Sequence, residues 1–83
     1  MRVFLTPSAQ KNFKKIPQQE QKKIAKKLIE LENNPYAGKK LEGELKGFYS
    51  LRAWPYRILY EINEDEQRIE VHKIAHRQGA YKV

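Results

Sequence analysis

The spacing of apolar residues changes abruptly near residue 48, and this change constrains the fold more than any other feature of the sequence. Before it, apolar side chains recur at the spacing of a helix. After it, apolar and polar side chains alternate, as they do in a strand with one buried face. A chain of 83 residues has room for one thin core. We therefore expect a single domain over residues 1–83, with two helices packed on one face of a small sheet.

The helical part contains two amphipathic segments separated by a proline. Ile24, Leu28 and Leu31 share one face of the longer segment, and Pro17 ends the shorter one. The expected order is strand, helix, helix and then a three-stranded antiparallel meander, which is an α+β fold (β-α-α-β-β-β). The expected elements cover residues 2–6, 7–16, 18–33, 49–54, 56–62 and 68–76.

The alternation in the second half separates two faces of the sheet. Leu51 and Ile58 lie on the apolar face, which the helices should cover, while Arg52 and Arg57 point to the open face from adjacent strands. Residues 39–47 are expected to form a basic loop punctuated by glycine. Ile74 is out of phase with the earlier apolar residues of its strand, which indicates a β-bulge.

The net charge of +7 favours an anionic partner such as nucleic acid, or an acidic protein. Residues 1–47 hold 11 basic against 5 acidic side chains, whereas residues 48–83 hold 6 against 5. Most of the excess is lysine in the helical half of the chain, and runs of lysine on helices are also typical of a solvated surface. The charge therefore raises the expectation of a polyanion partner without deciding it.

Cysteine is absent, which excludes disulfides and thiolate metal sites. The first ten residues contain only three consecutive apolar side chains, so we expect neither a signal peptide nor a membrane anchor. These features together predict a soluble cytoplasmic domain that does not associate with a membrane.

Several kinds of catalytic site are absent from the sequence. It has no Gly-rich phosphate loop and no nucleophile motif, and its later acidic residues gather around one polar turn without the spacing of a Ca²⁺ loop. His72 and His76 are four residues apart, roughly 13 Å along a strand. We therefore expect no metal site and no cofactor.

What remains is a set of cations with an aromatic hydroxyl. Arg52 and Arg57 share the open face, and the segment from His76 to Lys82, which includes Arg77 and Tyr81, follows the last strand closely enough to fold near them. Such a set can bind a phosphodiester and stack a base. On RNA it can also assist attack by the 2′-OH without a metal. Each of these residues is equally compatible with an ordinary surface role, so chemistry alone leaves catalysis open.

Two longer segments carry a resemblance to a known family. LEGELKGFYSLRAWPYRILYEI resembles the Leu-x-Gly…Tyr-x-x-Arg…Tyr-Arg-x-x-Tyr pattern of the RelE/ParE toxin superfamily. VHKIAHRQGAYK resembles the closing Ile-x-His-Arg…Tyr of its RelE-like branch. The resemblance implies a toxin of a type II toxin–antitoxin pair with the fold described above. RelE-like members cut mRNA in the ribosomal A site without a metal, whereas ParE-like members poison DNA gyrase.

The resemblance also implies roles for individual residues. Arg57 matches the arginine that contacts the scissile phosphate, and Arg77 matches a second arginine that stabilises charge or protonates the leaving group. Tyr81 matches the tyrosine that stacks on the nucleotide. Arg52 matches a basic residue that aids 2′-OH activation.

One position departs from the family pattern. Ser50 stands where some members have a lysine, so the acceptor of the 2′-OH proton is open, and His76 is a tentative candidate for part of that role. Further RNA contacts are expected from Ser50, Lys46, Lys82, Lys22, Lys23, Lys26 and Lys27.

The resemblance implies three partners: a cognate antitoxin, the ribosome and mRNA. The toxin–antitoxin complex is expected to bind operator DNA through the antitoxin. Two alternatives to RNA cleavage stay open, a ParE-like gyrase poison and an inactive homologue that acts with its antitoxin as a co-repressor.

Overall fold

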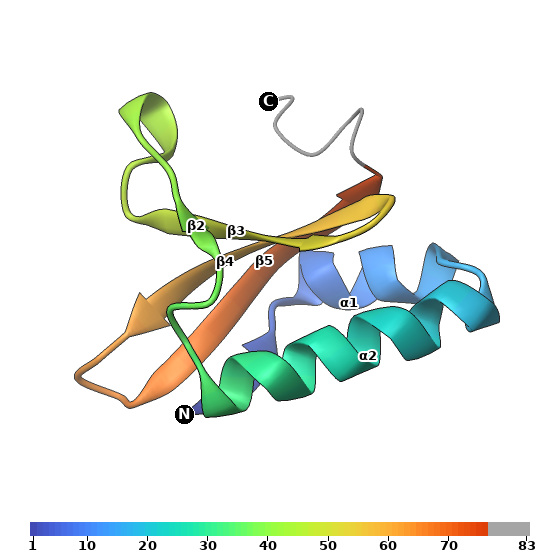
Figure 1. The fold of residues 1–83 in the computed structure, drawn as a ribbon, viewed down its shortest axis with the longest axis horizontal. Coiled ribbons are helices and arrows are strands. Elements are labelled where there is room, and N and C mark those ends of the chain that lie inside the picture. The colour runs from blue at the N-terminus through green and yellow to red at the C-terminus, as the bar shows by residue number, and fades with distance from the viewer. Residues whose placement is uncertain (77–83) are drawn as a thin grey trace.

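The structure is a computed structural model that describes residues 1–76. Two helices lie on one side of a five-stranded sheet (Figure 1). The strand order is β1-β5-β4-β3-β2, with β1 parallel to β5 and every other pair antiparallel. The elements are β1 (Arg2–Leu5), α1 (Pro7–Lys15), α2 (Gln18–Asn33), β2 (Lys39–Lys40), the 3₁₀ helix η1 (Gly43–Leu45), β3 (Phe48–Ala53), β4 (Tyr56–Asn63) and β5 (Arg68–His76). The predicted α+β fold with two helices on one face of the sheet is confirmed, and the sheet has one strand, β2, beyond those predicted.

Local sequence signals fix both ends of α1. The hydroxyl of Thr6 accepts a hydrogen bond from the backbone N–H of Ala9 at 3.2 Å, which caps the first turn, and Pro7 occupies a first-turn position that tolerates proline. Ile16 leaves the helical conformation immediately before Pro17. The chain can then reverse, and α2 runs back along the sheet.

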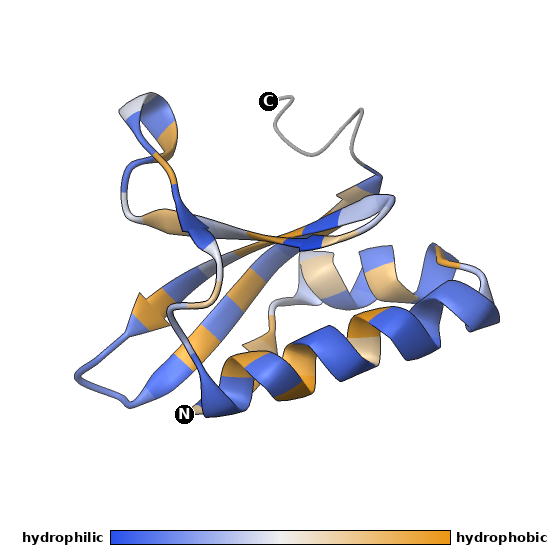
Figure 2. Cartoon of the chain, in the orientation of Figure 1, coloured by the Kyte–Doolittle hydropathy of each residue, from blue (hydrophilic) through white to orange (hydrophobic). Residues whose placement is uncertain are grey.

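The core lies between the helices and the face of the sheet that the alternation predicted. Tyr60 and Ile58 are fully buried on β4, and Ile24 and Leu31 are fully buried on α2. Leu51 is also buried, and Figure 2 shows apolar residues recurring along both helices and the central strands. Helix and sheet therefore cover each other's apolar faces, as expected for two layers around one core.

The predicted bulge is present in β5. Leu59 pairs with Lys73 but Tyr60 pairs with Val71, so His72 is an extra residue in that strand. This shift returns Ile74 to the buried face, where it is 3% exposed. It also leaves His72 on the open face.

The sequence predicted a loop over residues 39–47, and this prediction was wrong for its first two residues, which form β2. The start of β2 depends on the close approach of Gly38 to the sheet. A Cβ at this position would lie 2.6 Å from the Tyr60 hydroxyl, so only glycine allows the close approach. The N–H of Gly38 donates to that hydroxyl at 2.9 Å, and the hydroxyl donates to the Pro35 carbonyl at 2.8 Å. The buried Tyr60 thus holds the connection from α2 to β2 against the sheet.

Neither helix within residues 1–76 is long and apolar enough to cross a membrane.

Candidate nucleic-acid interface

Two arginines face each other directly across the open side of the sheet. Arg52 on β3 is the cross-strand partner of Arg57 on β4, next to the turn at Trp54 and Pro55. Like charges in directly opposed positions destabilise a sheet. Among the residues that the structure describes, no carboxylate forms an ion pair with either guanidinium. An anion placed between them would relieve the repulsion.

A hollow of about 360 Å³ surrounds this pair. Lys39, Leu41 and Ser50 line it together with the two arginines. Ser50 is only 7% exposed and forms part of the floor. Lys39 lies opposite Ser50 in the β2–β3 ladder, so its side chain lies on the open face. Three cations from three neighbouring strands therefore gather at one site.

Lys39 was not predicted as a site residue, because β2 has only two residues and so short a strand shows no alternation of apolar and polar side chains. The other residue of β2, Lys40, lies opposite Tyr49, on the face turned toward the helices. The one signal available was the position of Lys39 directly after Gly38, the residue that must approach the sheet closely.

The remaining predicted site residues divide into two groups. His76 is the cross-strand partner of Tyr56, and their rings are in edge-to-face contact at 5.8 Å. Because Tyr56 alternates onto the face of the helices, His76 lies on that face and not beside Arg57. Arg77, Tyr81 and Lys82 lie outside the described residues.

The lysines of α2 lie in the helical layer, on the other side of the sheet from the arginine pair (Figure 1). Lys23 pairs with Glu20 at 3.2 Å and donates to the carbonyl of Trp54, and Lys27 pairs with Glu30 at 3.3 Å. Lys22 and Lys26 are exposed. Lys46 follows η1 in the exposed loop that rises on the side of the sheet opposite the helices.

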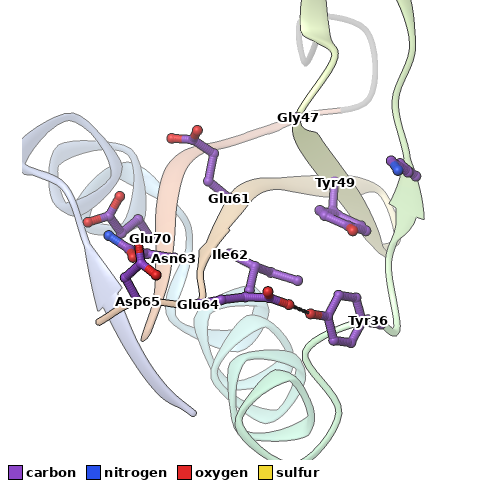
Figure 3. Close-up of a pocket in the computed structure, with 10 residues that line it drawn as sticks. Tyr36, Gly47, Tyr49, Glu61, Ile62, Asn63, Glu64, Asp65 and Glu70 are labelled. Carbon is purple, nitrogen blue, oxygen red and sulfur yellow. Dashed lines mark hydrogen bonds between the residues drawn. The ribbon is translucent and has the colours of Figure 1, made fainter. Parts of the chain in front are cut away.

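A larger hollow of about 550 Å³ lies at the other end of the sheet and has the opposite charge (Figure 3). Four acidic side chains line it, Glu61, Glu64, Asp65 and Glu70, together with Lys40, so acidic groups outnumber basic ones. The Tyr36 hydroxyl donates a hydrogen bond to Glu64, and this bond raises the pKa of Tyr36 above its ordinary value. Carboxylates would repel a phosphodiester, so the basic hollow is the better site for a polyanion despite its smaller volume.

The basic hollow can bind a phosphate through charge-assisted hydrogen bonds. Guanidinium groups match the geometry of phosphate oxygens and stay protonated at all physiological pH values. Because the groups are held on strands rather than on a loop, they can meet extra negative charge that develops on phosphorus without rearranging.

Comparisons with known proteins show the family to which the chain is similar. The sequence model of the family described as ParE toxin of type II toxin-antitoxin system, parDE, matches residues 3–81. The chain is 33% identical over 87 residues to Toxin RelE from Mycobacterium tuberculosis, covering 98% of this chain and 86% of that protein. It is also 33% identical over 76 residues to Putative toxin RelE1 from Methanocaldococcus jannaschii, covering 87% of this chain and 84% of that protein.

The fold is similar to that of solved toxin structures. The crystal structure of the toxin–antitoxin complex RelBE2 from Mycobacterium tuberculosis contains a chain that superposes with a TM-score of 0.86 at 28% identity, covering 92% of this chain and 96% of that one.

Proposed function

This chain belongs to the RelE/ParE toxin superfamily of type II toxin–antitoxin systems, and from that premise we propose that it is a metal-independent endoribonuclease that cleaves mRNA in the ribosomal A site. The matching family model is named for ParE whereas the similar proteins are named RelE, so family membership alone does not decide between RNA and gyrase as the target. The observation that favours RNA is the pair of directly opposed arginines, with Lys39 beside them in one hollow.

The proposed reaction uses a nucleophile that the RNA supplies. The 2′ oxygen attacks the adjacent phosphorus as its proton departs, the bond from phosphorus to the 5′ oxygen breaks, and the leaving oxygen takes up a proton. The products are a 2′,3′-cyclic phosphate and a 5′-hydroxyl, and no water is consumed. The protein has to align the groups and stabilise the additional negative charge.

Each cation of the hollow has a part in this proposal. Arg57 contacts the scissile phosphate, and Arg52 lies across from it beside the attacking 2′-OH. Lys39 supplies a third positive charge from β2, beside Ser50, where some relatives of the superfamily have a lysine. Arg77 and Tyr81 are proposed for leaving-group stabilisation and base stacking.

We also propose a cognate antitoxin as the partner of this chain. The similar RelBE2 structure from Mycobacterium tuberculosis is described as a toxin–antitoxin complex, and a similar structure from Pyrococcus horikoshii OT3 is an archaeal RelE–RelB complex. An acidic segment of the antitoxin laid across the basic hollow would neutralise Arg52 and Arg57 and block access of RNA. The proposed place of action is the cytoplasm, where ribosomes translate.

The test is a reconstituted translation system programmed with a defined mRNA. Added protein should stop elongation and produce cleavage within the A-site codon, and Arg57→Ala should lower the rate by ~10²-fold or more, by analogy with the loss of one oxyanion-hole contact. A purified gyrase supercoiling assay runs in parallel. Inhibition of gyrase with intact mRNA would replace the proposal with the ParE-like function, and normal cell growth during expression of soluble protein would favour the inactive co-repressor.

A further inference from the structure

A second pair of like charges is opposed on the same open face, at the end of the sheet away from the arginines. Glu61 on β4 is the cross-strand partner of Glu70 on β5. A phenylalanine continues the row on each side, since Phe48 pairs with Glu61 and Phe4 pairs with Glu70. The two carboxylates thus lie side by side between two phenylalanines, and like charges in directly opposed positions destabilise the sheet.

The bulge in β5 brings an imidazole to this pair. His72 is the extra residue of the strand, and its Nε2 lies 2.8 Å from Oε1 of Glu61. One ligand atom from each of Glu61, Glu70 and His72 lies within 4.8 Å of the other two. All three residues are half-buried, so they are neither fully solvated nor closed to a small ion.

Neighbouring side chains fix the orientation of two of these three groups. Arg68 donates from Nε and Nη2 to the same oxygen of Glu70, Oε2, at 2.9 and 2.8 Å, which leaves Oε1 available. Phe48 packs its ring edge-to-face on His72 at 5.3 Å between centroids. Groups that position ligands in this way are typical of metal sites, where outer partners set the angle of a carboxylate or imidazole.

We propose that Glu61, Glu70 and His72 bind a divalent transition metal ion, with zinc as the best match to one imidazole and two carboxylates. The ion would take the place of the hydrogen bond between His72 and Glu61. The ligand atoms would have to approach to about 2.0–2.2 Å from the ion, a change that side-chain rotation can supply. The ion would offset the part of the Glu61–Glu70 repulsion that the ion pair of Glu70 with Arg68 leaves, and it would join β4 to β5.

The proposed ion would not take part in the proposed RNA cleavage. Glu61 and Arg57 are four residues apart on β4, roughly 13 Å along the strand. Both carboxylates also line the acidic hollow of Figure 3, which lies away from the basic one. The proposed metal site is therefore separate from the proposed toxin function. A result against metal binding would leave that function untouched.

The experiment is a titration of the tag-free full chain with Co²⁺, whose visible absorption reports ligand geometry, followed by displacement with Zn²⁺. We expect one ion per chain, a rise in melting temperature of several degrees with Zn²⁺, and at least a 10-fold loss of affinity in both His72→Ala and Glu70→Gln. His76→Ala is the matched control, because His76 is on the opposite face, and it should bind Co²⁺ as the wild type does.

A measurement on the wild type keeps the test independent of variant folding. Zn²⁺ should shift the NMR signals of the His72 imidazole at one equivalent and leave those of His76 in place. Absence of a Co²⁺ spectrum, equal binding by His72→Ala, or a shift at His76 alone would each overturn the proposal.

Discussion

Replacing Arg57 by glutamine should make the protein more stable while removing its activity. The reason is the direct opposition of Arg52 and Arg57, which no carboxylate among residues 1–76 offsets by an ion pair. If the pair had a structural role, loss of one member would weaken the fold. If its role is to bind an anion, the free protein carries an unfavourable repulsion that the variant relieves. Functional sites commonly cost stability in this way.

The size of the effect follows from the spacing of the strands. Directly opposed side chains start about 4.5–5.5 Å apart at Cβ. Two unit charges near 6 Å interact by about 0.7 kcal/mol in water, and by more where the surface lowers the dielectric constant. We therefore expect Arg57→Gln to raise the free energy of unfolding by about 0.5–1 kcal/mol. In a domain of this size that corresponds to an increase of roughly 2–8 °C in melting temperature.

The assay is urea and thermal unfolding at low salt and at 1 M NaCl, where the Debye length falls to about 3 Å and the gain should largely disappear. Arg68→Gln is the matched control, because Arg68 is paired with Glu70 at 2.8 Å. Its removal should lower stability slightly at low salt. Destabilisation by Arg57→Gln, or a gain that persists unchanged at high salt, would refute the reasoning.

Three further predictions concern Lys39, Tyr60 and the lysines of α2. Lys39→Ala should reduce RNA cleavage about 10-fold and Lys39→Arg should restore most of it, whereas Lys40→Ala, on the other face of β2, should leave the cleavage rate unchanged. Tyr60→Phe removes a hydroxyl that satisfies two backbone groups and should cost about 1–3 kcal/mol in urea unfolding. Burial raises the pKa of Tyr60 above its ordinary 10.0. The contribution of the neutral hydroxyl to the free energy of unfolding is therefore fully present below pH 10.0 and is lost as the pH rises through the pKa of the folded state. Tyr60→Phe should accordingly lose less stability than the wild type at alkaline pH. Lys22→Ala with Lys26→Ala should weaken ribosome association and its dependence on salt in a sedimentation assay, and unchanged binding would exclude a contact there.

The architecture could be predicted because the sequence carries a strong local signal for each long element. The alternation on β3 and β4 assigned Arg52 and Arg57 to the open face, and the phase change at Ile74 indicated the bulge. Both results depend only on the two-residue period of a strand, which tertiary contacts rarely override once one face is buried.

The parts that could not be predicted depend on pairing between distant segments. A two-residue strand has no period, so β2 and the contribution of Lys39 to the hollow appear only when its partner Ser50 is known. The same holds for Glu61, Glu70 and His72, whose spacing along the chain suggested no shared site but whose strands bring them together. His76 was grouped with Arg57 because the segment from His76 to Lys82 was expected to fold near the open face, whereas the register places His76 on the opposite face with Tyr56.

The most direct test of the central claim is the chemical identity of the RNA ends that the protein produces on translating ribosomes. If the basic hollow promotes 2′-OH attack, the upstream fragment ends in a 2′,3′-cyclic phosphate and the downstream fragment begins with a 5′-hydroxyl. A 2′-deoxy substitution at the cleaved nucleotide should then abolish cutting. Full-length mRNA at saturating protein, or cleavage that survives the 2′-deoxy substitution, would contradict the account.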